Sequence, residues 1–219
     1  MSQCEPEICA RLRTRMGQRV RFVLLFLSAS ICSMYAHELG HAAAGWVQGI
    51  PVFPSPAKEY VLLTTNEWRE QIWIAFGGPA ATAIVVSIAI LWASRNRGHA
   101  LCAILAGVLV EPAFYVIRSL LIGRSHDGSE WQEAQSAISL NPNGQALDLL
   151  FVFLFFAGCA VLAVRDELQL QWRSFAKWLS LGLVGVTTLI LIQVGNNAVF
   201  DRHFPKTQTM NIPSVVKAE

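Results

Sequence analysis

One short segment has the residue types and spacing of a hydrolytic metal site. It reads His37-Glu38-Leu39-Gly40-His41. In a helix, residues i and i+4 lie on one face about 6 Å apart along the axis, so both imidazole rings can reach one ion. Glu38 points to the side, where its carboxylate can take a proton from a water on the metal. Two nitrogen ligands and a general base in an HExxH arrangement are typical of zinc hydrolases. The segment therefore predicts one Zn²⁺ per chain.

The depth of this motif in a membrane helix supports metal binding. Residues 22–36 carry no charge but are too few to cross a hydrocarbon core of about 30 Å. A span that begins at Phe22 must include the motif, and at ~1.5 Å per residue His37 lies roughly 22 Å along it. Ionisable side chains at that depth are costly and usually functional. This favours a metal site over an interfacial helix end in which Glu38 extends to water. Small residues around the motif, Gly40 and Ala42 to Gly45, predict close packing of another helix.

The motif needs a third ligand, because a catalytic zinc ion usually has three protein ligands and one open position. The candidates lie within and after the third apolar segment: Glu111, His126, Asp127, Glu130 and Glu133. Gly123 and Gly128 on either side of Asp127 would let the chain turn toward the metal. Glu111 lies at comparable depth, so both positions remain open.

The composition excludes a soluble globular domain. Of 219 residues, 53% are hydrophobic and 15% are charged, with a mean hydropathy of +0.42, whereas soluble domains have about 25% charged residues. Five scattered cysteines argue against a disulfide-linked secreted scaffold. A net charge of +2 gives no basis for nucleic-acid binding. We expect an all-α integral membrane protein surrounded by the lipid bilayer, and its oligomeric state is open.

Five segments are apolar enough to form transmembrane helices. They cover residues 22–46, 72–93, 100–122, 149–164 and 178–194. Together they form one domain, residues 22–195, between a basic N-terminal tail, residues 1–21, and a C-terminal tail, residues 196–219. Lys and Arg are more frequent in the N-terminal tail and in the loops after the second and fourth segments. This pattern favours a cytoplasmic N-terminus in a multi-pass protein of the cell membrane.

The first loop is predicted to form a short β-hairpin. Its segments Gly49 to Pro54 and Tyr60 to Thr65 are rich in β-prone residues. Such a hairpin could offer an edge strand to an unwound substrate, and an ordinary interfacial loop is the alternative. In a five-span topology this loop lies on the side where the first segment ends, the second begins and the third ends. The candidate site residues therefore converge there.

Three motifs in this order resemble the site-2 protease family of intramembrane metalloproteases, the M50 peptidases. They are the HELGH at residues 37–41, Gly77-Gly78-Pro79-Ala80 and Asp127-Gly128. They reach across about half of the chain, over the first three predicted spans. Ala81-Thr82 stands where the family often has an asparagine, and residues 123–126 replace its usual proline-rich lead into Asp-Gly. These departures indicate a divergent, minimal member.

The resemblance implies a three-helix metalloprotease core. Carried over by position, it implies that His37, His41 and Asp127 are zinc ligands and that Glu38 is the catalytic base. It further implies that Gly77, Gly78 and Pro79 shape the substrate cleft. The implied reaction is hydrolysis of peptide bonds in a membrane-protein substrate by a zinc-bound water that Glu38 activates. The substrate helix must unwind locally, because its amides are otherwise hydrogen-bonded.

Two other functional classes stay open. A catalytically silent relative would bind a membrane partner without turnover, and the intact Glu38 argues against it. A metal-binding transporter or sensor would line an ion path with the histidines and Glu111. That reading predicts polar residues along several spans, whereas the fourth and fifth segments have almost none.

Overall fold

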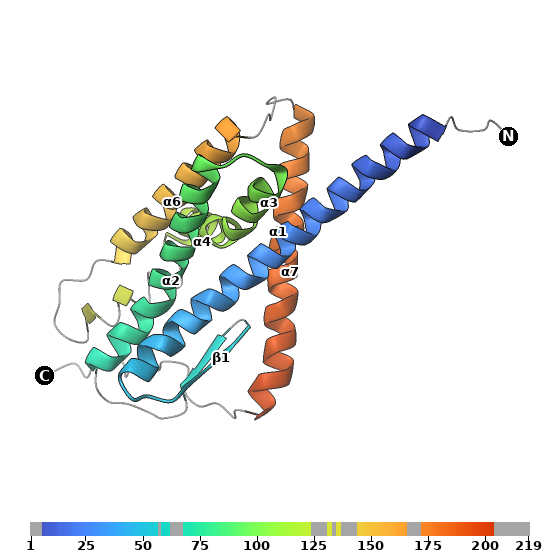
Figure 1. Ribbon diagram of the computed structural model, residues 1–219. Helices are drawn as coiled ribbons and strands as arrows, with labels where there is room; N and C mark the ends of the chain where they lie inside the picture. Colours follow the sequence, from blue (N-terminus) through green and yellow to red (C-terminus); the bar gives the residue numbers. More distant parts are fainter. Residues whose placement is uncertain are drawn as a thin grey trace, which may run out of the picture.

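The computed structural model of this chain describes residues 6–56, 58–61, 68–123, 131–132, 135–136, 144–165 and 172–203. These residues form a helical bundle with one small sheet (Figure 1). The helices are α1 (Pro6–Val47), α2 (Trp68–Arg95), α3 (His99–Val108), α4 (Val110–Ile122), α6 (Gly144–Arg165) and α7 (Trp172–His203). The strands are β1 (Val52–Ser55) and β2 (Lys58–Val61). The predominantly helical architecture is confirmed.

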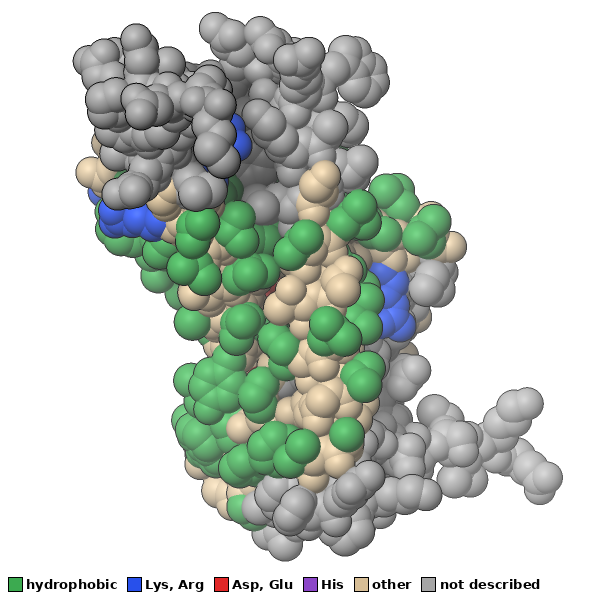
Figure 2. Space-filling model, turned by 90° about the vertical axis from the view of Figure 1, so that its right-hand side faces the viewer, with side chains coloured by type: hydrophobic (Ala, Val, Ile, Leu, Met, Phe, Trp, Pro, Cys, Tyr) green, Lys and Arg blue, Asp and Glu red, His purple; other side chains and the backbone are tan. Residues whose placement is uncertain are grey.

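Within the described part of the chain, five helical segments are long and apolar enough to cross a membrane. They are Gly17–Val47, Ile72–Arg95, His99–Leu121, Gln145–Val164 and Gly182–Phe200. They match the five predicted segments, although α1 continues without a break back to Pro6, through most of the predicted tail. Hydrophobic side chains dominate the visible described surface in Figure 2, and Leu120 and Leu121 are each 79% exposed. Lipid would cover such a surface, whereas water would leave it unfavourably hydrated.

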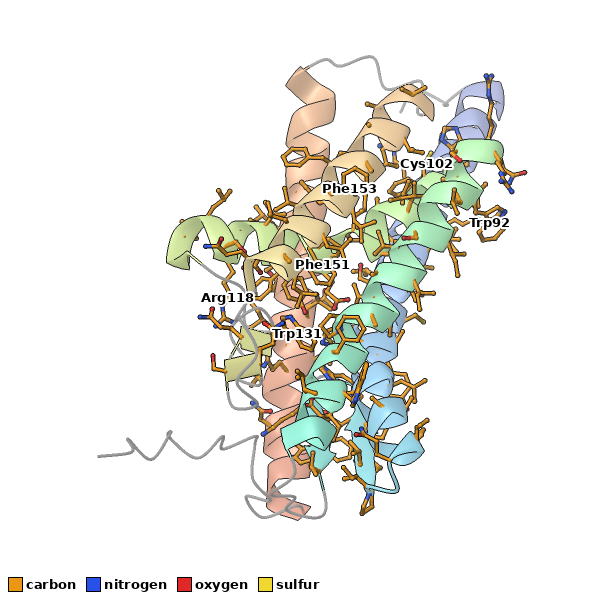
Figure 3. All side chains as sticks on the ribbon, turned by 90° about the vertical axis from the view of Figure 1, so that its left-hand side faces the viewer. Trp92, Cys102, Arg118, Trp131, Phe151 and Phe153 are labelled. Carbon is orange, nitrogen blue, oxygen red and sulfur yellow. The ribbon has the colours of Figure 1, made fainter. Side chains whose placement is uncertain are left out.

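The third span bends at Leu109, where α3 ends and α4 begins. Pro112 has no backbone N–H, so the carbonyl of Val108 loses its normal helical partner there. Beyond the bend, α4 runs across the direction of α2 and α6 (Figure 3). This span is the most enclosed, with 61% of its window buried, against 11% for α7. The bend directs the first turn of α4, which contains Glu111, toward α1 and α2.

Two glycines let α1 and α2 cross with their backbones in contact. A Cβ added to Gly40 would collide with the carbonyl oxygen of Gly77, and a Cβ on Gly77 would collide with that of Gly40. The predicted close packing of another helix on Gly40 is therefore confirmed. Gly45 differs, because it faces the side chain of Val52 in β1 instead of a second helix.

The predicted hairpin between the first two spans is present, although its second strand begins at Lys58, before the predicted segment Tyr60 to Thr65. Strands β1 and β2 pair antiparallel, with Val52 opposite Val61 and Pro54 opposite Glu59. Trp46 Nε1 in α1 donates a hydrogen bond of 2.8 Å to the carbonyl of Val52. Val52 also packs with Ala42 and with Ile74 of α2. The hairpin is thus fixed to α1 directly after the HELGH motif.

Candidate functional site

The two histidines of the motif face each other on the buried side of α1. His37 and His41 are only 7% and 3% exposed. Their Nε2 atoms lie 3.0 Å apart, and their ring centroids are 4.7 Å apart at an interplanar angle of 75°. This agrees with the prediction from i, i+4 spacing that both rings reach one point.

The opposite ring nitrogens are held by oxygen atoms from α2 and α4. His41 Nδ1 lies 2.6 Å from the carbonyl oxygen of Ile74. His37 Nδ1 lies 2.9 Å from Thr82 Oγ1 and 2.9 Å from Glu111 Oε1. Since a carbonyl and a carboxylate accept hydrogen bonds and cannot donate them, each Nδ1 carries the hydrogen. When such a ring is neutral, its Nε2 is an unprotonated acceptor.

Glu111 is held by a partly buried hydrogen-bond network. Thr82 Oγ1 donates to Glu111 Oε1 at 2.9 Å, and Ser33 Oγ donates to Glu111 Oε2 at 3.2 Å. Thr82 therefore accepts from His37 while it donates to the carboxylate. Glu111 lies at the Nδ1 edge of the His37 ring, on the far side from Nε2. In this position it orients the ring and does not face the point where the two Nε2 atoms meet.

The histidine pair fits a zinc ion. Two acceptor nitrogens at 3.0 Å repel each other unless a cation or a proton lies between them. Two nitrogens bound to one tetrahedral zinc at about 2.0–2.1 Å would be about 3.3 Å apart, close to the observed separation. Carboxylate or carbonyl acceptors on the second ring nitrogen are the usual support of a metal-binding histidine.

Gly78 of α2 packs directly against the paired nitrogens, where a residue with a side chain would not fit. A Cβ at this position would collide with Nε2 of His41 and would lie 2.7 Å from Nε2 of His37. Gly77, one residue earlier, makes the backbone contact with Gly40. Pro79 is fully buried in α2. Gly78 of the Gly-Gly-Pro segment thus lies directly against the histidines, and Gly77 lies against α1.

The sequence predicts the third ligand either within the third span, at Glu111, or after it. Asp127 and His126, together with Glu130 and Glu133, lie outside the described residues. Among the residues that the structure does describe, no three His, Cys, Asp or Glu side chains form a group that could hold a metal ion. The described part of the site therefore consists of two prospective metal ligands, His37 and His41, and the residues that hydrogen-bond to them.

Glu59 of β2 is a site residue that the sequence analysis missed. Its side chain hydrogen-bonds with that of Glu38 and lies within electrostatic range of His41 and His37. Burial raises the pKa of Glu59, but His41, the hydrogen bonds with Glu38 and with the Glu59 backbone, and His37 together lower it below its ordinary value. The only available signal was an acidic residue in a β-prone loop close to the motif.

No protein-family model, no curated protein and no solved structure matches this chain. What the protein does is therefore inferred from its own residues. The described site combines two facing imidazole nitrogens, a neighbouring carboxyl group on the same helix and an adjacent position without a side chain. That set supplies two of the ligands that a divalent metal ion requires and a carboxyl group of the kind that transfers protons.

Proposed function

We propose that this protein is an intramembrane zinc metalloprotease similar to the site-2 proteases. Its substrate would be a membrane-embedded segment of another protein. The observation that carries this proposal is the facing pair of Nε2 atoms, 3.0 Å apart, with each Nδ1 held by an oxygen acceptor. Glu38 on the same helix supplies the base that hydrolysis requires.

His37 and His41 would hold the ion through Nε2, and Asp127 is the proposed third ligand. Zinc, when bound, polarises the peptide carbonyl and lowers the pKa of water to about 7. Glu38 accepts the proton from the attacking water and delivers it to the leaving amine. Thr82 and Glu111 keep the His37 ring in the tautomer that leaves Nε2 unprotonated.

The hairpin is the proposed docking strand for the substrate. Helical substrate has its amides hydrogen-bonded and must unwind before its peptide bond can be attacked. An unwound segment could pair with an edge of the two-stranded sheet. Because β1 and β2 are anchored next to the HELGH motif, this pairing would bring the segment to Glu38.

The test is the metal content of detergent-purified protein, together with cleavage by the reconstituted protein of a panel of single-span membrane proteins. We expect about one zinc per chain in the wild type, loss of zinc in His37→Ala, and weakened binding in Asp127→Ala. Glu38→Gln should keep zinc and lose cleavage, because both histidines remain while the base is gone. Folded wild-type protein without zinc would overturn the proposal, as would normal cleavage by Glu38→Gln.

A further inference from the structure

Arg118 of α4 is a cation within the third apolar span that the proposed reaction does not use. We propose that its guanidinium group binds a carboxylate of the substrate, about three residues along the chain from the peptide bond that is cut. Substrates with a glutamate or an aspartate at that distance would then be preferred. This inference rests on the proposed function, because it takes the histidine site as the place of cleavage.

The first observation is that Arg118 has an unpaired donor inside the protein. Its Nε atom is buried, and no described residue accepts a hydrogen bond from it. The ion pair described in this region joins His37 with Glu111 and does not include Arg118. Arginines within membrane spans are costly and normally pair with an anion or with carbonyl groups. Arg118 therefore has both the charge and the donor that an anionic ligand requires.

The second observation is that Arg118 shares a helix face with two α4 residues at the histidine site. Residues 111, 115 and 118 have the spacing i, i+4 and i+7, which places them on one face. Glu111 Oε1 lies 2.9 Å from His37 Nδ1, and the Tyr115 ring lies 6.4 Å from the His37 ring, centroid to centroid. From Glu111 to Arg118 the helix rises roughly 10 Å, the length of about three residues of extended chain. An unwound segment along this face would reach from the histidines to Arg118.

The third observation is that Arg118 lies at the edge of the lipid-exposed surface of α4. The exposed apolar side chains of this helix are Phe114, Ile117, Leu120 and Leu121. Tyr115 and Val116 are buried, and Arg118 is intermediate between the two groups. Figure 3 shows that this end of α4 projects beyond α6. A membrane-embedded segment that approaches α4 from the lipid would meet Arg118 before it reached Tyr115 and the histidines.

An aromatic cluster lies between α4 and the histidine site. Tyr115 stacks on Phe151 of α6, with ring centroids 4.4 Å apart and an interplanar angle of 7°. Trp131 packs against this pair, and its ring lies 5.3 Å from that of Phe76 in α2. Phe76 comes shortly before Gly78, which lies against both histidines. The cluster offers mainly apolar contacts to a passing segment, which leaves the guanidinium group to distinguish one substrate sequence from another.

The experiment compares the binding of matched single-span peptides to Glu38→Gln protein, which keeps both histidines and lacks the base. The peptides are leucine- and alanine-rich helices with a central Gly-Pro pair, and they carry either Glu or Gln about three residues before or after that pair. Fluorescence anisotropy in detergent gives the dissociation constants, at a mildly alkaline pH that keeps Glu ionised. In one of the two placements we expect the Glu peptide to bind at least about tenfold more tightly than the Gln peptide.

Adding Arg118→Gln should abolish this preference. Arg118→Lys should keep part of it, because the charge remains while the bidentate contact is lost. Arg97→Gln is the matched control, since Arg97 is exposed beyond the far end of α2 and its loss removes the same charge. Equal binding of the Glu and Gln peptides, or a preference that survives Arg118→Gln, would overturn the inference.

Modification by phenylglyoxal, followed by peptide mass spectrometry, tests the same contact in protein that retains Arg118, in case Arg118→Gln does not fold. The Glu peptide should slow the modification of Arg118 relative to that of Arg97, and the Gln peptide should not. Protection by phosphatidylglycerol but not by the Glu peptide would assign a lipid headgroup to Arg118 and overturn the inference.

These measurements involve neither zinc nor cleavage, so they separate the two proposals. Preference for the Glu peptide through Arg118 in a protein that lacks zinc would overturn the proposed protease function and keep the carboxylate site. A zinc-containing protein that cleaves its substrates without this preference would keep the protease function and overturn the carboxylate site.

Discussion

Helices α2 and α7 both have the length and apolar character of a membrane span, yet they meet the rest of the molecule in different ways. Helix α2 crosses α1 with its backbone in contact at Gly40 and Gly77, and 39% of its window is buried. Helix α7 has 11% of its window buried. Its contacts with the hairpin are a long hydrogen bond from Asn196 and the packing of the Phe200 ring.

The difference shows which helix crossing must be accurately positioned for the histidine site to form. The α1–α2 crossing sets the positions of Thr82, Ile74 and Gly78 relative to the histidines, so small displacements there would disrupt the site. Most of α7 would face lipid, where apolar side chains are interchangeable and conformational shifts are inexpensive. We therefore expect substitutions at the crossing to have large effects and matched substitutions in α7 to have small ones.

The largest effect is expected from Gly78→Ala. The new methyl group would collide with Nε2 of His41 and crowd that of His37, so zinc binding should fall below detection. The measurement is zinc per chain by elemental analysis of purified protein. Gly182→Ala in α7 is the matched control, because a Cβ there meets nothing within 4 Å. Full zinc occupancy in Gly78→Ala would refute the assigned metal position.

Gly40→Ala should destabilise the fold itself. Its methyl group would meet the carbonyl of Gly77 and the Cβ of Ala81, which forces the two helices apart. We expect a loss of about 3 kcal/mol in the free energy of unfolding, the upper end for overpacking. Denaturation in detergent, followed by circular dichroism, measures this. Gly195→Ala in α7 has no neighbour within 4 Å and should remain as stable as the wild type.

Glu111→Ala separates a supporting residue from a metal ligand. Loss of a group that orients a ligand typically weakens metal affinity about 10–100-fold, or roughly 1.4–2.7 kcal/mol. Competition with a chelator of known affinity measures this loss of metal affinity. Thr82→Val should weaken metal affinity by a similar factor, because it removes the hydroxyl group that links His37 to Glu111. Complete loss of zinc in Glu111→Ala alone would instead assign Glu111 as a ligand.

Asn196→Leu is expected to have the smallest effect. Its side chain is only 6% exposed, but its hydrogen bond to Tyr60 is 3.5 Å long, so the substitution removes one weak hydrogen bond. The free energy of unfolding should change by less than about 1 kcal/mol. Thermal melting in detergent measures it. If Asn196→Leu lowered the free energy of unfolding as much as Gly40→Ala does, α7 would be packed as tightly as α2, and the contrast between the two helices would be wrong.

Much of the fold followed from local sequence. The spans were predictable because each is a continuous run of apolar residues, and the hairpin because β-prone residues surround a short turn. The facing of His37 and His41 was predictable because helical periodicity alone places i and i+4 side by side. The close packing at Gly40 followed from the small size of the residues there.

The parts that sequence reasoning missed depend on distant contacts. The side of the His37 ring that Glu111 occupies is determined by the bend at Leu109 and by the position of α4 against α1. Nothing local to Glu59 indicates that it meets Glu38, because this depends on the register of the sheet and on how Val52 docks at Gly45. Hydropathy likewise did not indicate that little of α7 is buried against the rest of the protein.

By itself, the sequence determined that five apolar segments exist and that one of them carries two histidines and a glutamate on helical spacing. These are properties of single segments, and they hold however the segments later pack. Only the tertiary structure decided that Gly78 faces both Nε2 atoms, that Glu111 supports His37 from behind, and that Glu59 reaches Glu38. Each of these brings together residues from different helices or strands, and such contacts depend on crossing angle, register and backbone approach, which no single segment encodes.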